Sequence, residues 1–226
     1  MLLPEHGAAA QALALLALPL LGSSLVLAGG RVTLVAIRWS AFQALALAGV
    51  GVTIVTLRPS WDQAAAAGLV LLVNALALPL LLYAAGAGVG RHGDLSAAAA
   101  RYPARGSWPM GALAFGLIAV AFLLVRPLQL PGTAVAGPLV PTVVALWLVG
   151  AQIGLLGAGT TIRACGLLSI ANGTLVLGLA TGSGLCPVLG LGYGIDALAL
   201  ALVLGERALL GSGAVGVARS EPESFR

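Results

Sequence analysis

Charged residues are scarce in this sequence. Of its 226 residues only 8% are charged, whereas 60% are hydrophobic and the mean hydropathy is +1.07. A soluble domain carries roughly 25% charged residues, so the polar residues here cannot cover a compact globule in water. Disorder is excluded by the same numbers, because disordered chains are polar and highly charged. The sequence therefore predicts an integral membrane protein.

Lysine is absent, and the basic residues are arginines that stand one or two at a time between apolar runs. Such scattered arginines indicate membrane topology, so nucleic acid is not an expected partner in spite of the net charge of +4. The apolar residues occur in blocks and do not alternate with polar ones, which disfavours a β-barrel. An all-α membrane protein in contact with the lipid bilayer is the expected fold class.

Cysteine and histidine are too few for a self-contained zinc, haem or iron–sulfur site, so neither a metal nor a cofactor is expected. Cys165 and Cys186 stand roughly 30 Å apart at helical rise, which disfavours a disulfide between them. His6 and His92 lie outside the apolar runs, so no nucleophile–histidine arrangement is expected and no catalytic residue is assigned.

The apolar runs predict a single transmembrane domain over residues 1–226. Runs of about 17 to 25 residues suffice to cross a bilayer, and about seven are present, at residues 9–28, 38–57, 65–85, 110–125, 138–157, 164–182 and 187–205. Pro79 and Pro187 are expected to kink or to begin helices. Trp147 falls in the middle of a span and is expected to pack against a neighbouring helix, whereas the other tryptophans fall at span ends, where indole rings favour the membrane interface.

The arginines also predict an orientation. If the N-terminus is outside, Arg58 and Arg126 fall on the outer side and every other arginine falls on the inner side. The N-terminus is therefore expected outside and the C-terminus in the cytoplasm. The longest hydrophilic connection, residues 90–108, then lies on the inner side together with a short polar tail.

A faint internal repeat relates the first three spans to the last three. Residues 36–43 align with residues 165–172, and residues 74–78 with residues 196–200. An amide or acid in an apolar span marks each anchor of the alignment: Gln43, Asn74, Asn172 and Asp196. The prediction is a parallel 3+1+3 arrangement, with a first triplet at 1–89, a loop and linking helix at 90–137, a second triplet at 138–210 and a tail at 211–226. Superposition of the first triplet on the second, by a rotation about the membrane normal, is expected to place Gln43 near Asn172 and Asn74 near Asp196.

Asp196 is the carboxylate closest to the predicted midplane. Ten residues separate it from Glu206 at the inner boundary, roughly 15 Å at helical rise. One hypothesis makes it a proton-exchanging group in a buried water chain. The alternatives make it a helix cap after the glycine-rich residues 190–194, or the hydrogen-bond partner of another helix.

Each of the other polar residues in or near the spans can be interpreted in two ways. Asn172, Asn74 and Gln43 either form interhelical hydrogen bonds or line a hydrated path, and none of them can carry a proton itself. Arg38 and Arg163 are either boundary residues whose side chains reach the inner surface, or charge partners for Asp196 or for a carboxylate on another subunit.

Three stretches of the sequence together resemble a known family. They are residues 40–47 (SAFQALAL), 166–179 (GLLSIANGTLVLGL) and 194–204 (GIDALALALVL). These segments are similar to the hydrogenase-4 component E family, membrane subunits of energy-converting hydrogenases and formate hydrogenlyase-type complexes that are related to the K subunit of complex I. The similarity extends over most of the chain.

This resemblance implies a non-catalytic subunit of a complex in a prokaryotic inner membrane. Its partners would be antiporter-like membrane subunits and a hydrogenase-like or complex I-like module, and it would contribute to proton or ion translocation or act as a scaffold. Asp196 matches the family's acidic position in the last span. An acidic residue commonly precedes the Asn-Gly pair in the family, and a lysine is common before the proline of the third span. Here those positions hold Ala171 and Asn74.

Two other classes of function compete with this interpretation. A stand-alone small transporter or channel would use the repeat and Asp196 as its site, although a transporter of a charged solute usually needs compensating charges at midplane. A lone scaffold or assembly factor would need no such site.

Overall fold

The computed structural model describes residues 4–30, 33–87, 107–125, 139–157, 159–181 and 187–218, and nearly all of these residues are helical. In chain order the helices are α1 (Pro4–Gly29), α2 (Thr33–Leu57), α3 (Trp61–Val70), the π-helical segment η1 (Leu71–Ala77), α4 (Leu78–Ala87), α6 (Ser107–Val125), α7 (Val140–Leu156), α8 (Thr160–Thr181) and α9 (Pro187–Ala218). The described residues contain no strand. The predicted all-α fold class is confirmed.

Six of the predicted spans coincide with helices that are long and apolar enough to cross a membrane. These are α1, α2, the continuous α3–η1–α4, α6, α8 and the part of α9 from Pro187 to Glu206. The remaining predicted span, at 138–157, coincides with α7, which has 17 residues and is shorter than the others. The predicted connection at 90–108 lies outside the described residues apart from Ser107 and Trp108, and so do Cys186 and the tail beyond Ala218.

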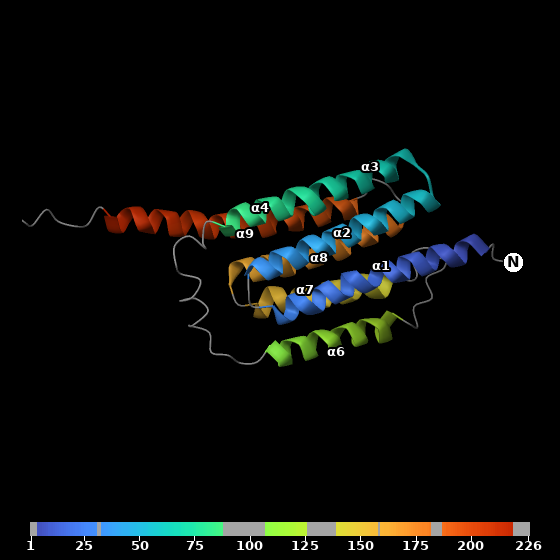
Figure 1. Cartoon of the computed structure of the whole chain (residues 1–226), viewed down its shortest axis with the longest axis horizontal. Coiled ribbons are helices and arrows are strands. Elements are labelled where there is room, and N and C mark those ends of the chain that lie inside the picture. The colour runs from blue at the N-terminus through green and yellow to red at the C-terminus, as the bar shows by residue number, and fades with distance from the viewer. Residues whose placement is uncertain are drawn as a thin grey trace, which may run out of the picture.

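The helices form two rows that lie against each other (Figure 1). One row contains α1, α2 and α3–η1–α4 in that order, and the other contains α7, α8 and α9. Each helix of the first row contacts its counterpart in the second: α1 contacts α7, α2 contacts α8, and α4 contacts α9. Helix α6 packs at one end of the rows, against α1 and α7, while the end of α9 continues past the other helices. As a result α8 and α2 lie at the centre of the bundle.

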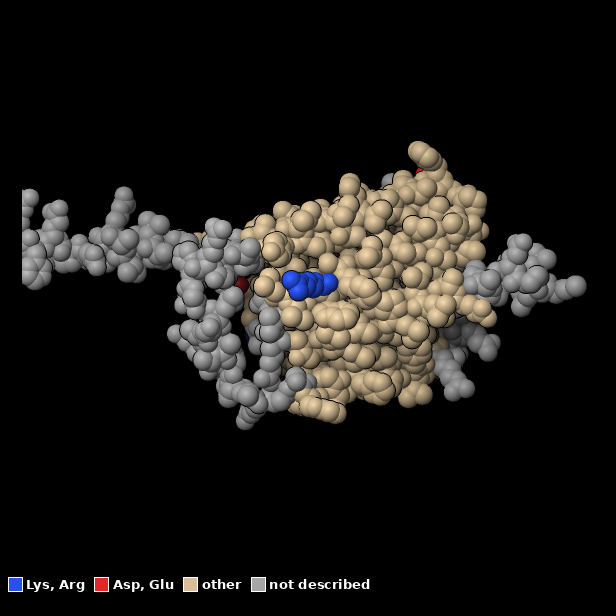
Figure 2. All heavy atoms as spheres, viewed as in Figure 1, with Lys and Arg blue, Asp and Glu red and all other residues tan. Residues whose placement is uncertain are grey.

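The outer surface of the bundle is apolar. Figure 2 shows one face, and nearly all of the described surface there belongs to residues without charge. Large hydrophobic side chains are exposed on both rows and on α6, among them Leu18, Leu72, Leu80, Phe115, Leu123 and Leu198. By contrast, 78% of the apolar stretch of α8 is buried. This distribution suits a bundle whose outer helices face lipid and whose centre faces protein.

Four helices begin a full turn or more before the predicted spans. The predicted spans start at residues 9, 38, 65 and 164, whereas α1, α2, α3 and α8 begin at Pro4, Thr33, Trp61 and Thr160. Arg38 and Arg163 therefore lie inside helices, with exposed side chains. A long arginine side chain can reach a membrane boundary from within a helix, so the charge does not mark the helix end.

A local cap explains the start of α3. The Ser60 hydroxyl oxygen accepts a hydrogen bond from the backbone N–H of Gln63 at 3.2 Å, with Ser60 in an extended conformation. Serine followed three residues later by glutamine is the pattern of a capping box. The cap fixes the helix start before the hydrophobic run begins.

The π-helical segment η1 precedes a proline. At its end the Leu78 N–H bonds to the carbonyl of Val73, five residues back instead of four. Pro79 has no N–H, and in a regular α-helix its ring would clash with the carbonyl four residues earlier. The wider π turn accommodates that ring within a continuous membrane helix. Pro187, the second proline expected to shape a helix, begins α9.

Close glycine contacts hold α7 against α8. A Cβ atom built on Gly166 would lie 2.5 Å from the backbone nitrogen of Gly154 and 2.7 Å from the carbonyl oxygen of Gly150. Glycines four residues apart on one helix let the backbone of a second helix approach closely, and this packing stabilises helix pairs in membranes. This glycine motif is not among the features predicted from the sequence.

Gly166→Ala is therefore expected to destabilise the bundle, because its methyl group would meet backbone atoms that cannot move independently. The expected loss is about 1–3 kcal/mol in the free energy of unfolding, the usual cost of overpacking. Gly116→Ala on α6 is the matched control, since a Cβ atom there meets nothing within 4 Å. Unfolding of the purified proteins in detergent, followed by circular dichroism, measures the difference. Equal stability of the two variants would contradict the packing account.

Candidate functional site

The four polar residues that anchor the predicted repeat are all buried. Gln43, Asn74, Asn172 and Asp196 expose between 0% and 3% of their surface. The Asn172 amide nitrogen Nδ2 donates to Gln43 Oε1 at 3.0 Å, and Asn74 Nδ2 donates to Asp196 Oδ2 at 2.7 Å. Each pair of residues that the alignment makes equivalent is therefore in direct contact.

Gln43 is the centre of the first group of polar residues, which we call the Gln43 cluster and which also contains Ser24, Ser169 and Asn172. Its Nε2 donates to the Ser24 hydroxyl at 2.7 Å and to the Leu20 carbonyl at 3.3 Å. Its Oε1 accepts from Asn172 and from the Ser169 hydroxyl, the latter at 3.1 Å. The amide thus uses both hydrogens and both oxygen lone pairs. The cluster joins α1, α2 and α8.

Sequence reasoning missed Ser24 and Ser169. Serine is common in membrane helices because its hydroxyl can bond to the carbonyl of the preceding turn, and Ser24 does donate to Leu20 O at 2.9 Å. Nothing in the sequence distinguishes a serine that also serves a distant amide. Only the spacing of Ser169 could have indicated its role, because a residue three positions before Asn172 lies on the same helix face.

The second group is the pair Asn74–Asp196, which joins η1 to α9. One hydrogen bond connects the two side chains. Asn74 Oδ1, Asp196 Oδ1 and the hydroxyl of nearby Tyr193 are buried and have no hydrogen-bond partner among the described residues. A buried polar atom without a partner costs about 1–3 kcal/mol. Unlike the Gln43 cluster, this pair is therefore incompletely satisfied.

The structure decides between the two structural alternatives for Asp196. The residue lies well inside the continuous helix α9, which begins at Pro187, so the helix-cap alternative is wrong. The glycines at 190–194 are helical too and do not interrupt α9. The second alternative, a hydrogen bond to another helix, is confirmed by the bond from Asn74.

Neither candidate charge partner belongs to this pair. The side chains of Arg38 and Arg163 are exposed. Arg163 Nε donates to the carbonyl oxygen of Gly157 at 3.1 Å, where it satisfies the end of α7. Their positions fit the interpretation as boundary residues. The carboxyl of Asp196 makes its hydrogen bond to an uncharged amide instead.

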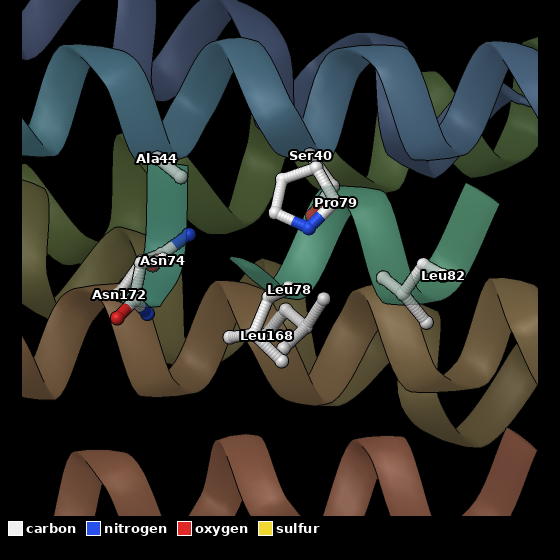
Figure 3. Close-up of a pocket in the computed structure, with 8 residues that line it drawn as sticks. All are labelled: Ser40, Ala44, Asn74, Leu78, Pro79, Leu82, Leu168 and Asn172. Atoms are coloured by element: carbon white, nitrogen blue, oxygen red, sulfur yellow. The ribbon is translucent and has the colours of Figure 1, made fainter. Parts of the chain in front are cut away.

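A small cavity is lined by Asn172 of the Gln43 cluster and by Asn74 of the Asn74–Asp196 pair (Figure 3). It is bounded by Ser40 and Ala44 of α2, by Leu168 and Asn172 of α8, and by Asn74, Leu78, Pro79 and Leu82 of η1 and α4. It offers about 10 Å³ to the centre of a water molecule. One amide from each group, Asn172 and Asn74, faces this space.

Trp147 marks a further contact between helices. Its indole Nε1 donates to the Thr174 hydroxyl at 3.1 Å, and a Cβ atom on Gly173 would lie 3.0 Å from the Trp147 ring. This confirms the prediction that Trp147 packs against a neighbouring helix. Trp61 and Trp108 are more than 80% exposed at the first turns of α3 and α6, as suits residues at a membrane interface.

Metal-binding groups do not occur in the part of the chain that the structure describes, since no three His, Cys, Asp or Glu side chains gather there. Cys165 is a buried free thiol. Comparisons with family models, curated proteins and solved structures gave no match to this chain.

The Gln43–Asn172 hydrogen bond is expected to give a measurable coupling energy. In a double-mutant cycle of Gln43→Ala and Asn172→Ala, the expected coupling is roughly 0.5–2 kcal/mol, the range for hydrogen bonds between membrane helices. Thr174, which bonds to Trp147 on the other side of α8, is the control partner for Gln43. Gln43→Ala and Thr174→Ala should be additive in the same unfolding assay. Zero coupling between Gln43 and Asn172 would show that the contact does not stabilise the bundle.

Proposed function

We propose that this chain is a non-catalytic membrane-arm subunit of a complex I-like energy-converting hydrogenase-type complex. In this role it contributes to proton or ion translocation, or it scaffolds antiporter-like subunits and the module that they carry. The resemblance of residues 40–47, 166–179 and 194–204 to the hydrogenase-4 component E family supports the assignment. These three segments lie on α2, α8 and α9, which include the two central helices of the bundle.

The observation that carries the proposal is the hydrogen bond between Asn74 and Asp196. Asn74 occupies the position at which the family commonly has a lysine, and Asp196 occupies the family's acidic position. The two positions are in direct contact across η1 and α9, so a lysine here would stand beside the acid. Asn74 still contacts Asp196 but lacks the positive charge that a lysine would bring. Ala171 is buried beside Asn172 and adds no titratable group.

Asp196 is accordingly the candidate for proton exchange in this subunit. Desolvation disfavours a charged carboxylate, and an amide partner compensates less of that cost than a cation does. Asn172, Asn74 and Gln43 would hold hydrogen bonds around it and would not carry protons themselves.

The row arrangement supports the proposed parallel 3+1+3 repeat. Helices α1, α2 and α3–α4 pair in order with α7, α8 and α9, and Figure 1 shows that paired helices run in the same direction. Helix α6 would then be the linking helix, and α7 would complete the set of spans. Its 17 residues cover about 25 Å, close to the thickness of the hydrocarbon core. The distribution of arginines supports an inner membrane orientation with the N-terminus outside and the C-terminus in the cytoplasm.

A stand-alone transporter or channel is the second candidate. It would use the same carboxylate and the same repeat. The cavity beside Asn74 has space for about one water molecule, which is too little for a solute. The absence of a charge beside Asp196 among the described residues also disfavours a charged solute. The subunit function is therefore preferred.

Asp196→Asn tests the functional role of this carboxyl. The substitution keeps the size and hydrogen-bonding capacity of the side chain but removes titration. We expect the complex to assemble normally while proton-coupled turnover in membrane vesicles falls. Asp196→Ala removes the partner of Asn74 as well, and it should also lower the amount of assembled complex.

Glu206→Gln is the matched control for this experiment. Glu206 is an exposed carboxylate on the same helix α9, so its loss should change neither assembly nor coupling. Normal assembly with unchanged coupling in Asp196→Asn would mean that the residue is structural and that the subunit serves as a scaffold.

A further inference from the structure

A buried acceptor at the junction of η1 and α4 lacks a donor. The oxygen Oδ1 of Asn74 is buried and has no partner among the described residues, although Nδ2 of the same amide is bonded to Asp196. Pro79, which follows in the same helix, has no N–H and cannot donate a hydrogen bond. In hydrocarbon such an acceptor cannot be satisfied by bulk water. A donor is needed at this place.

The cavity next to Asn74 has the size and lining of a water site. Asn74 and Pro79 both bound it, and Ser40 and Asn172 add further polar groups from α2 and α8. A buried water needs at least roughly 10–15 Å³ of space for its centre and two to four polar partners. The cavity provides about 10 Å³ on that measure, enough for one water molecule.

We propose that this cavity binds one ordered water molecule, which donates to Asn74 Oδ1 and connects the Asn74–Asp196 pair to the Gln43 cluster through Asn172. Asn172 and Asn74 are held in place by their hydrogen bonds to Gln43 and Asp196. The water would therefore connect two amides that have no hydrogen bond to each other among the described residues. This connection runs from Ser24 on α1 through Gln43, Asn172, the water and Asn74 to Asp196 on α9.

A neutral ligand fits the cavity better than a metal cation. The polar residues that bound it, Ser40, Asn74 and Asn172, are uncharged, and the carboxyl of Asp196 is not among them. A desolvated cation would require several oxygen ligands, at least some of them charged. Any role of this water in proton transfer rests on the proposed function. The existence of the water site does not.

In the proposed chain of hydrogen bonds, Asn74 connects the water to Asp196. Asn74 lines the cavity, its Nδ2 donates to the Asp196 carboxyl, and its Oδ1 is left for the water. The connection from the water to Asp196 therefore runs through an amide, which does not carry a proton itself.

X-ray radiolytic footprinting of the purified protein in lipid nanodiscs tests the water site. Radiolysis of a bound water oxidises the side chains beside it. Leu82 and Leu168 line the cavity and are 1% and 5% exposed, whereas the control residues Leu20 and Leu146 are 0% exposed and do not line it. We expect Leu82 and Leu168 to be oxidised and the two control leucines to stay unmodified. Oxidation of neither pair would show that the cavity is dry and would overturn the proposal.

Ala44→Val fills the cavity and should abolish the oxidation of Leu82 and Leu168. Ala48→Val is the matched control, because Ala48 is also buried on α2, one turn away, and does not bound the cavity. Oxidation that persists in Ala44→Val would assign the water elsewhere and overturn the proposal.

A high-resolution experimental density map of the unmodified protein gives the same answer without any variant. It should show one peak within hydrogen-bond distance of Asn74 Oδ1, and an empty cavity would overturn the proposal. Neither experiment depends on activity, so a failure of the water site is distinguishable from a failure of the proposed function.

Discussion

The free energy required to bury a polar group in hydrocarbon is the constraint on which this structure depends. An amide or carboxyl without a partner costs several kcal/mol in the bilayer core, so each must find its partner inside the bundle. Gln43 meets this requirement fully, with hydrogen bonds from both ends of its amide to α1 and α8. Because those bonds join α1, α2 and α8, they fix which helices of the two rows face each other.

Glycine contacts and hydrogen bonds act on different parts of the bundle. Gly150, Gly154 and Gly166 let α7 and α8 approach to backbone contact. The hydrogen bonds of the Gln43 and Asn74 side-chain amides instead connect one row to the other. Dispersion contacts favour any well-packed arrangement, whereas an amide accepts only a correctly placed partner. The polar residues therefore select one arrangement among several apolar ones, and the incompletely satisfied pair Asn74–Asp196 is the place where function is expected.

The sequence predicted the helical fold and made Gln43 equivalent to Asn172 and Asn74 equivalent to Asp196, whereas the contacts within each pair come from the structure. Hydropathy and the positions of buried polar residues are strong signals in a chain with so few charges. The predicted starts of α2 and α8 are too late because Arg38 and Arg163 resemble span boundaries in the sequence, although arginine side chains reach the surface from within a helix. The π-helix before Pro79, the serines around Gln43 and the cavity depend on how helices meet, and hydropathy carries no signal for that.

Native mass spectrometry of the gently solubilised protein tests the central claim most directly. The row structure leaves large apolar side chains exposed on outer helices, and either lipid or other membrane subunits can cover them. The proposed function requires that part of this surface be covered by specific partners in fixed numbers. We predict complexes in which one copy of this chain is accompanied by antiporter-like subunits and a hydrogenase-like or complex I-like module. A homo-oligomer that contains only this chain would contradict the account and would favour a stand-alone transporter or channel.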